Sequence, residues 1–192
     1  WVMNYAAKLR GGRAASLPTG SALTGTLAHE ILAQLLQDPG ATPEQAGALF
    51  ERLGPQLAAE LFLPGAERER ANAERMVIES ASALIEMIRQ RKMIVKGVEQ
   101  SYVRRALGTK LRGRLDLVLD HPLCVVDLKL RGSTRFREAL QQGTAHQLAL
   151  YSYLAGGRKA DMPPVAYFVL EDQRLISTDR RAFPDADHVD GP

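Results

Sequence analysis

Two apolar stretches in the second half of the chain carry charged residues inside otherwise hydrophobic runs. The first spans residues 110–119 and contains Asp116, and the second spans 123–130 and contains Asp127 and Lys129. Both are short and rich in Leu and Val, which is typical of β-strands. Residues two apart on a strand point to the same face, so Asp127 and Lys129 are predicted to lie together.

An Asp-His-Pro turn is expected to join these two strands. If Asp120 pairs with Leu123, Asp116 falls opposite Asp127, with Cβ atoms about 5 Å apart. Like charges at that distance are destabilising unless a cation lies between them. Because Mg²⁺ and Mn²⁺ prefer carboxylate oxygens, this pairing predicts a divalent-metal site with Lys129 beside it. A slip of one residue in the register moves one carboxylate to the other face.

The same residues also allow a simpler interpretation, in which Asp127 and Lys129 form a surface ion pair and Asp116 is merely exposed. An Asp-x-Lys triplet on a strand is common. Apolar residues surround all three charges, however, and an unpaired buried charge is expensive. The sequence around these three residues leaves both interpretations open.

The remaining patterns predict an α/β fold with a mixed sheet, because helical periodicity gives way to strands and then alternates with them. Helices are expected over residues 23–37, 43–63 with an interruption at Gly54-Pro55, 66–92 and 136–154, and further strands over 95–103 and 164–170. On the strand at 110–119, alternation places Leu111, Leu115, Leu117 and Leu119 on one face and Arg112, Arg114 and Asp116 on the other.

The length of 192 residues suits one domain with a real core. We expect a mainly helical region over residues 1–92, an α/β core over 93–170 and a loose tail over 171–192. The chain opens on Trp1 without a starting Met, so we expect it to be a fragment of a longer protein.

The net charge of +3 hides an uneven distribution, since nine Lys or Arg and one acid, Glu99, lie between Arg89 and Arg114. Such clustering suits a polyanionic partner, although a solvated strand edge has the same composition. The only cysteine, Cys124, is expected to be a small buried hydrophobe. No apolar run reaches the length of a membrane span and no segment resembles a signal peptide, so a cytoplasmic location is expected.

Three polar residues outside the strands are candidates for the same site. His29 lies in the first firm helix and is either a structural histidine or a third metal ligand. Gln147 and Tyr151 are four apart on one face of a late helix, where they either pack in the core or line the site. Arg131, Arg135 and Arg137 follow Lys129, and they either bind phosphate or belong to a solvated loop.

Together these segments resemble the PD-(D/E)xK nuclease superfamily, in its RecB-like branch. The matching pieces are Gly25-Thr-Leu-Ala-His29-Glu-Ile-Leu32, Gly113-Arg-Leu-Asp116, Val125-Val-Asp127-Leu-Lys129 and Gln147-Leu-Ala-Leu-Tyr151. They occur in that family's order over roughly residues 24–154. The opening Trp1 to Leu9 is similar to the end of the helix that begins such domains.

The resemblance implies a restriction-endonuclease-like core, a mixed β-sheet flanked by helices, and an N-terminal helical region. It implies that Mg²⁺ or Mn²⁺ is bound by His29, Asp116, Asp127 and the Leu128 backbone carbonyl. Lys129 would orient or activate the attacking water, and Gln147 and Tyr151 would support the site. Glu99 would be a further acid behind the ligands, and the candidates for DNA contact are Arg112, Arg114, Arg131 and Arg135.

The implied activity is metal-dependent hydrolysis of single- or double-stranded DNA, by an exonuclease more than an endonuclease. Such a module would serve DNA repair or recombination, beside a helicase or other domains of a larger protein. Some relatives carry four cysteines around an iron–sulfur cluster, and because this chain has one cysteine, no such cluster is expected here. The alternatives are a non-catalytic DNA-binding or assembly module with the same fold, and a hydrolase of a small phosphate ester.

Overall fold

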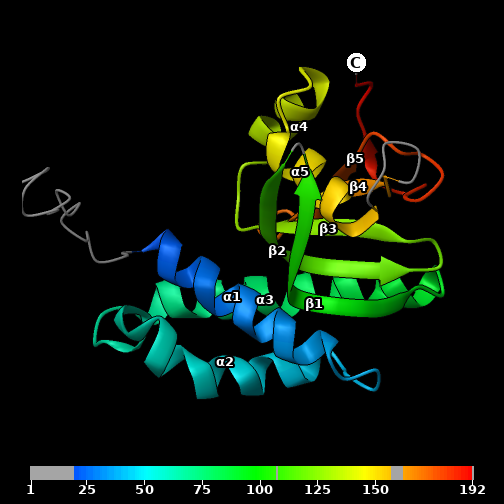
Figure 1. The fold of residues 1–192 in the computed structure, drawn as a ribbon. Coiled ribbons are helices and arrows are strands. Elements are labelled where there is room, and N and C mark those ends of the chain that lie inside the picture. Colours follow the sequence, from blue (N-terminus) through cyan, green and yellow to red (C-terminus); the bar gives the residue numbers. More distant parts are fainter. Residues whose placement is uncertain (1–19, 107, 157–161, 192) are drawn as a thin grey trace, which may run out of the picture.

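The computed structural model describes residues 20–106, 108–156 and 162–191. The expected helix end at residues 1–9 lies outside this part of the chain. The helical region comprises α1 (Ser21–Leu36), α2 (Glu44–Leu57), a short 3-10 helix η2 (Ala59–Phe62) and α3 (Glu67–Gln90). Figure 1 shows these helices forming a layer on one side of the sheet.

Within the described residues the sheet has six strands in sequential order, so each strand lies beside its neighbour in the sequence. The strands are β1 (Ile94–Ala106), β2 (Thr109–Asp120), β3 (Cys124–Lys129), β4 (Val165–Val169), β5 (Arg174–Ser177) and β6 (Asp187–His188). The pairs β3–β4 and β5–β6 are parallel and the other pairs antiparallel. The predicted α/β fold with a mixed sheet is therefore confirmed.

Two helices connect β3 to β4 and cover the other side of the sheet, as a parallel pair requires. They are α4 (Ser133–Gln141) and α5 (His146–Gly156), above the sheet in Figure 1. The prediction of one helix over residues 136–154 is wrong. Gly143 adopts a φ of 66°, which glycine tolerates and which ends a helix, and the chain restarts at His146.

The expected interruption at Gly54-Pro55 lies three residues later, because α2 continues through Pro55 to Leu57. Gly54 is buried beneath the Phe62 ring, and a Cβ at this position would be 2.2 Å from it. The absence of a side chain therefore serves packing between α2 and η2 rather than a break.

The described residues form three apolar clusters, a large one beneath the helical layer and two smaller ones on the opposite side of the sheet, one of which joins α4 to β4 and β5. The larger cluster joins α1 and α3 to one face of the strands and includes Leu27, Ile31, Val77, Leu84, Leu117, Leu119, Val126 and Leu128. A smaller cluster beneath α5 contains Leu115, Val118, Val125, Tyr151 and Leu154. Cys124 is fully buried in the first cluster, as expected, and burial raises the pKa of its thiol to about 12.

The prediction of a loose tail after residue 170 is wrong. β5 and β6 extend the sheet, and Phe183 between them is fully buried. Both strands are too short to produce a readable alternation, and they are ordered by contacts with distant elements. Among the described residues, no helix combines the length and the apolar composition needed to cross a bilayer.

Candidate active site

The β2–β3 hairpin has the register that brings the two aspartates together. Leu117 pairs with Val126 and Val118 with Val125, and one further step sets Asp116 across from Asp127. Asp127 is fully buried and Asp116 is 8% exposed, which excludes the surface ion pair. The Leu128 N–H also donates to Asp116 Oδ2 at 2.8 Å, which ties the two strands together at this point.

β2 does not keep the strict alternation that its sequence predicts. Leu115 packs beneath α5, whereas Leu117 packs against the helical layer on the opposite side. The change occurs at Asp116, beside Glu99 of β1, which adopts a φ of 48°. A residue in the left-handed region interrupts regular pairing, and the prediction that Leu115 and Leu117 share a face is therefore wrong.

His29 of α1 reaches the strands at this irregular point. Its Nδ1 lies 3.3 Å from Glu99 Oε1 and 4.0 Å from Asp116 Oδ2. His29, Glu99 and Asp116 each place a ligand atom within 4.8 Å of the others, a geometry that can hold a metal ion. Glu99 was expected behind the ligands, and it contacts His29 directly, as a carboxylate that orients a histidine ligand does. Its positive φ brings it there, and no residue type in the sequence signals that conformation.

Asp127 belongs to a second set of contacts on the α5 side. The Lys129 Nζ lies 2.6 Å from Asp127 Oδ2 and donates to Gln147 Oε1 at 3.2 Å. The Gln147 Nε2 lies 3.2 Å from Asp127 Oδ1 and 2.9 Å from the Tyr151 hydroxyl. The face shared by Gln147 and Tyr151 is thus turned toward the strand pair, and Tyr151 also packs in the core.

The two aspartates are held in an environment that opposes their negative charge, whereas the environment of Glu99 favours its charge. Burial, and then the charge of Asp116, raises the pKa of Asp127 to about 6, against the lowering effect of Lys129. Burial also raises the pKa of Asp116, although His29 and the Leu128 N–H oppose this. The hydrogen bond with His29 and the charge of Arg114 lower the pKa of Glu99 despite its partial burial.

Burial acts to lower the pKa of His29, but Glu99 and Asp116 outweigh it and the pKa is raised. The site therefore concentrates negative charge that favours a cation.

The donor set fits a hard divalent cation. Asp127 Oδ2 is buried, and the Lys129 ammonium lies 2.6 Å from it, but no other donor among the described residues reaches this oxygen. A carboxylate oxygen has two acceptor lone pairs, so one remains beside Asp116 and is suited to a metal. One imidazole nitrogen and carboxylate oxygens from Asp116, Asp127 and Glu99 suit Mg²⁺ or Mn²⁺ better than soft metals.

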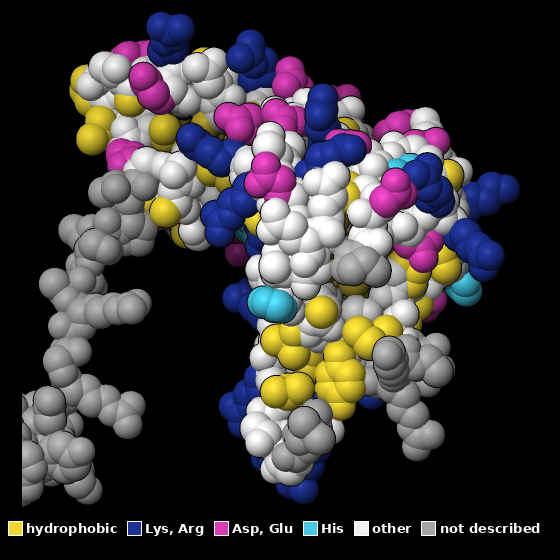
Figure 2. Space-filling model, turned by 90° about the horizontal axis from the view of Figure 1, so that it is seen from above, with side chains coloured by type: hydrophobic (Ala, Val, Ile, Leu, Met, Phe, Trp, Pro, Cys, Tyr) yellow, Lys and Arg dark blue, Asp and Glu magenta, His cyan; other side chains and the backbone are white. Residues whose placement is uncertain are grey.

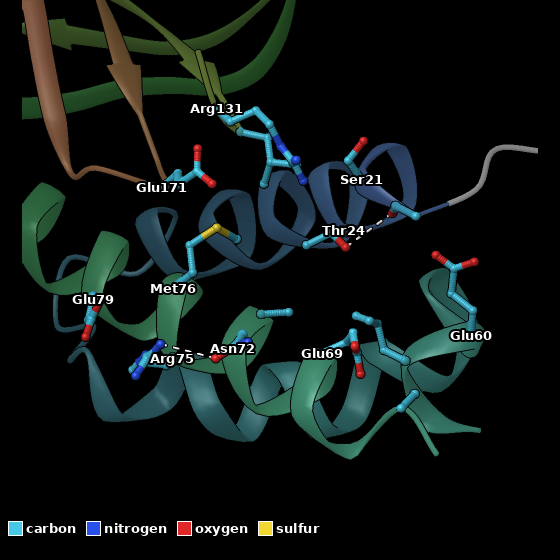
Figure 3. A pocket seen from close by; sticks show the side chains of 15 residues that line it. Ser21, Thr24, Glu60, Glu69, Asn72, Arg75, Met76, Glu79, Arg131 and Glu171 are labelled. Atoms are coloured by element: carbon cyan, nitrogen blue, oxygen red, sulfur yellow. Dashed lines mark hydrogen bonds between the residues drawn. The ribbon is translucent and has the colours of Figure 1, made fainter. Parts of the chain in front are cut away.

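The four candidate arginines differ in their relation to this cluster. Arg114 Nε lies 2.7 Å from Glu99 Oε2, and Arg112 is exposed two residues away on β2. Arg131 lines a cleft of about 760 Å³ between α1, η2 and α3, where Figure 3 shows it reaching toward the first turn of α1. Arg135 lies 5.9 Å from the Phe136 ring. Among the described residues, neither Arg131 nor Arg135 is hydrogen-bonded or ion-paired to the carboxylates.

The comparison with protein families agrees with this geometry. The model of the PD-(D/E)XK nuclease superfamily matches residues 1–189. No curated protein matches the chain. Nucleases of this kind use divalent metals, and the cluster of His29 on α1, Glu99 on β1 and Asp116 on β2 lies beside β3, which carries the Asp127-Leu-Lys129 triplet. The chain belongs to the PD-(D/E)XK nuclease superfamily.

Proposed function

We propose that the chain is a Mg²⁺- or Mn²⁺-dependent deoxyribonuclease of the RecB-like kind, an exonuclease module that serves DNA repair or recombination. One observation carries the proposal. Two carboxylates, Asp116 and Asp127, lie buried across one hairpin, with the Lys129 ammonium group in contact with one and the His29 imidazole beside the other. A folded protein does not keep this arrangement without compensation, and a divalent cation provides it.

In this proposal His29, Asp116, Asp127 and the Leu128 backbone carbonyl hold the cation. Glu99 joins them, because its carboxylate lies in the same cluster. A bound divalent cation supplies Lewis-acid polarisation of the scissile phosphate and lowers the pKa of a water. The carboxylates fix where that chemistry takes place, since they come from rigid strands rather than loops.

Lys129 has the position of the group that orients the attacking water. Its ammonium is held between Asp127 Oδ2 and Gln147 Oε1, which leaves one of its three N–H donors for water or phosphate. The positive charge also stabilises the negative charge that develops on the phosphate. Gln147 keeps Lys129 and Asp127 in register and is itself held by Tyr151.

DNA is bound by arginine side chains outside the metal-ligand cluster. Arg112 and Arg114 lie on the strand that carries Asp116, and Arg131 and Arg135 follow the strand that carries Lys129. Figure 2 shows Lys and Arg side chains over much of the visible face, and several of them follow one edge where Asp and Glu are sparse. Such contacts are to the phosphate backbone, so they carry no sequence preference.

The test is a cleavage assay on labelled single- and double-stranded DNA with Mg²⁺ or Mn²⁺. The protein should degrade DNA only with metal, and Asp127→Ala or Lys129→Ala should lower the rate by at least about 100-fold. If linear DNA is degraded while circular DNA stays intact, the enzyme is an exonuclease. DNA binding without cleavage under every condition would favour the non-catalytic module, and cleavage by Asp127→Ala would refute the proposed site.

A further inference from the structure

Arg114 holds one carboxylate of the metal cluster from outside. Its Nε lies 2.7 Å from Glu99 Oε2 and donates to the Glu99 backbone carbonyl at 3.1 Å. The other carboxylate oxygen of Glu99 lies 3.3 Å from His29 Nδ1. Glu99 is thus shared between an imidazole inside the cluster and a guanidinium at its edge. In this state the positive charge of Arg114 opposes the binding of a cation by Glu99.

The other side of the Arg114 guanidinium is available to a ligand. The side chain is 64% exposed, and its two terminal amino groups have no hydrogen-bond partner among the described residues. A guanidinium presents five donors in a fixed fork that matches phosphate, so this free edge is suited to a phosphodiester.

Arg114 is also the innermost cation of a row. Lys110, Arg112 and Arg114 share one face of β2, at intervals of about 7 Å. The cross-strand partner of Lys110 is Arg105, so the same face of β1 adds a cation at the outer end of the row. All four side chains are exposed, and the row ends two residues before Asp116. A strand of DNA bound along this row therefore places a phosphate at Arg114, beside the metal cluster.

We propose that Arg114 acts as a substrate-responsive latch on the metal site. Its guanidinium neutralises the Glu99 carboxylate until a DNA phosphate binds the guanidinium and draws it away. Glu99 is then left with His29 and Asp116 as neighbours, and the uncompensated negative charge raises the affinity for a divalent cation. Because coupling between two ligands is reciprocal, the cation strengthens DNA binding by the same factor. This inference rests on the proposed nuclease function, since it assumes that DNA and a divalent cation bind at this site.

The experiment measures Mn²⁺ affinity with and without a short single-stranded oligonucleotide. It uses the Lys129→Gln background, which protects the DNA from cleavage and does not alter a residue in contact with Glu99. Free Mn²⁺ is followed by electron paramagnetic resonance, and Mn²⁺ bound by the oligonucleotide alone is subtracted. We expect DNA to raise the Mn²⁺ affinity of this parent roughly fivefold, at the lower end of measured couplings.

Adding Arg114→Gln should raise the Mn²⁺ affinity without DNA by a similar factor and remove most of the further increase on adding DNA. Arg112→Gln is the matched control, because it removes a cation of the same row that does not contact Glu99. It should weaken DNA binding while leaving the Mn²⁺ affinity of the DNA-free protein unchanged. Thermal melting of each variant checks that the fold is retained.

Two results would overturn the latch. One is an unchanged Mn²⁺ affinity in the Arg114→Gln variant, and the other is an equal increase in Arg112→Gln, which would indicate a general charge effect. If the parent binds both DNA and Mn²⁺ without coupling, the latch fails while the nuclease proposal stands. If the parent binds no Mn²⁺, the metal-dependent nuclease proposal fails together with the latch.

Discussion

Asp127 lies fully buried between the Lys129 ammonium group and the carboxylate of Asp116. Its pKa is raised from 3.8 to about 6, chiefly by burial. In the unfolded chain the same carboxyl has its ordinary pKa. Between these two values the folded state binds a proton that the unfolded state does not, so the contribution of Asp127 to the free energy of unfolding falls as the pH rises.

We therefore predict that Asp127 costs the metal-free protein stability as the pH rises from about 4 to about 6, and that this part of the loss is missing in Asp127→Asn. At about pH 8 the variant should be more stable than the wild type by on the order of 1 kcal/mol, a rise in Tm of about 3 °C. Comparing the two proteins isolates Asp127 from the other titrating groups. Calorimetry at several pH values measures the difference.

Magnesium provides the control for this prediction. It should raise the Tm of the wild type more at about pH 8 than at about pH 5, because a cation and a proton compete for the same carboxylates. It should have a much smaller effect on Asp127→Asn. If the stability of the wild type and of Asp127→Asn depended on pH in the same way, Asp127 would not be the source of the pH-dependent loss.

At the scale of the elements, α5 presses directly on β2 at Gly113. A Cβ added at this glycine would be 2.6 Å from Leu154 Cδ1 and 3.3 Å from a ring carbon of Tyr151. Leu154 is buried and has little room to move. The close approach keeps Tyr151, and through it Gln147, in place beside Asp127.

Gly113→Val should therefore lower the free energy of unfolding by about 2 kcal/mol, as overpacking does in a tight core. It should also reduce cleavage beyond the loss of folded protein, because α5 is displaced from the site. Gly25→Ala in α1 is the contrasting variant, since its Cβ would meet Leu130 at 3.9 Å, an ordinary contact. That change should leave stability unchanged or raise it by up to about 1 kcal/mol, as helix propensity favours alanine.

The C-terminal segment is part of the folded unit, and Phe183 is the residue that anchors it. Its side chain is fully buried, and the Arg91 guanidinium lies 5.9 Å from the ring. Phe183→Ala should lower the free energy of unfolding by about 3 kcal/mol in a denaturant titration. Arg180→Ala removes an exposed side chain nearby and should stay within about 0.5 kcal/mol of the wild type. An unchanged free energy of unfolding in Phe183→Ala would contradict this and indicate that the segment is a loose tail.

For the whole molecule, the distribution of charge matters more than the small net charge of +3. The basic row on the β1–β2 hairpin leads to the carboxylates, whereas the cleft in Figure 3 mixes Arg75 and Arg131 with Glu60, Glu69, Glu79 and Glu171. A polyanion is therefore attracted more strongly along the hairpin than to the cleft as a whole.

We predict that DNA affinity falls steeply with salt and that Arg112→Gln reduces the slope of log affinity against log salt by about 0.7 on single-stranded DNA, as expected for one lost phosphate contact. Arg75→Gln, in the mixed cleft, should leave the slope unchanged. Fluorescence anisotropy over a range of salt concentrations measures both. A larger effect from Arg75→Gln would place the DNA path on the helical layer instead.

The hairpin and its facing aspartates were predictable from the sequence, because two short apolar runs joined by a turn can be recognised from neighbouring residues alone. The same holds for the major helices, with their apolar stripes, and for the face shared by Gln147 and Tyr151. Local patterns also predicted a single helix over residues 136–154. This was wrong because Gly143 ends the first of two helices there.

The sequence by itself thus determined two carboxylates and a lysine at one place in an α/β fold. Only the tertiary structure decided that His29 reaches them, since this depends on how α1 packs on the sheet across more than eighty residues of chain. It also decided that Glu99 joins His29 through a positive φ and that Arg114 holds Glu99. These contacts arise from long-range packing and from a backbone conformation that no residue type demands, and they complete the site.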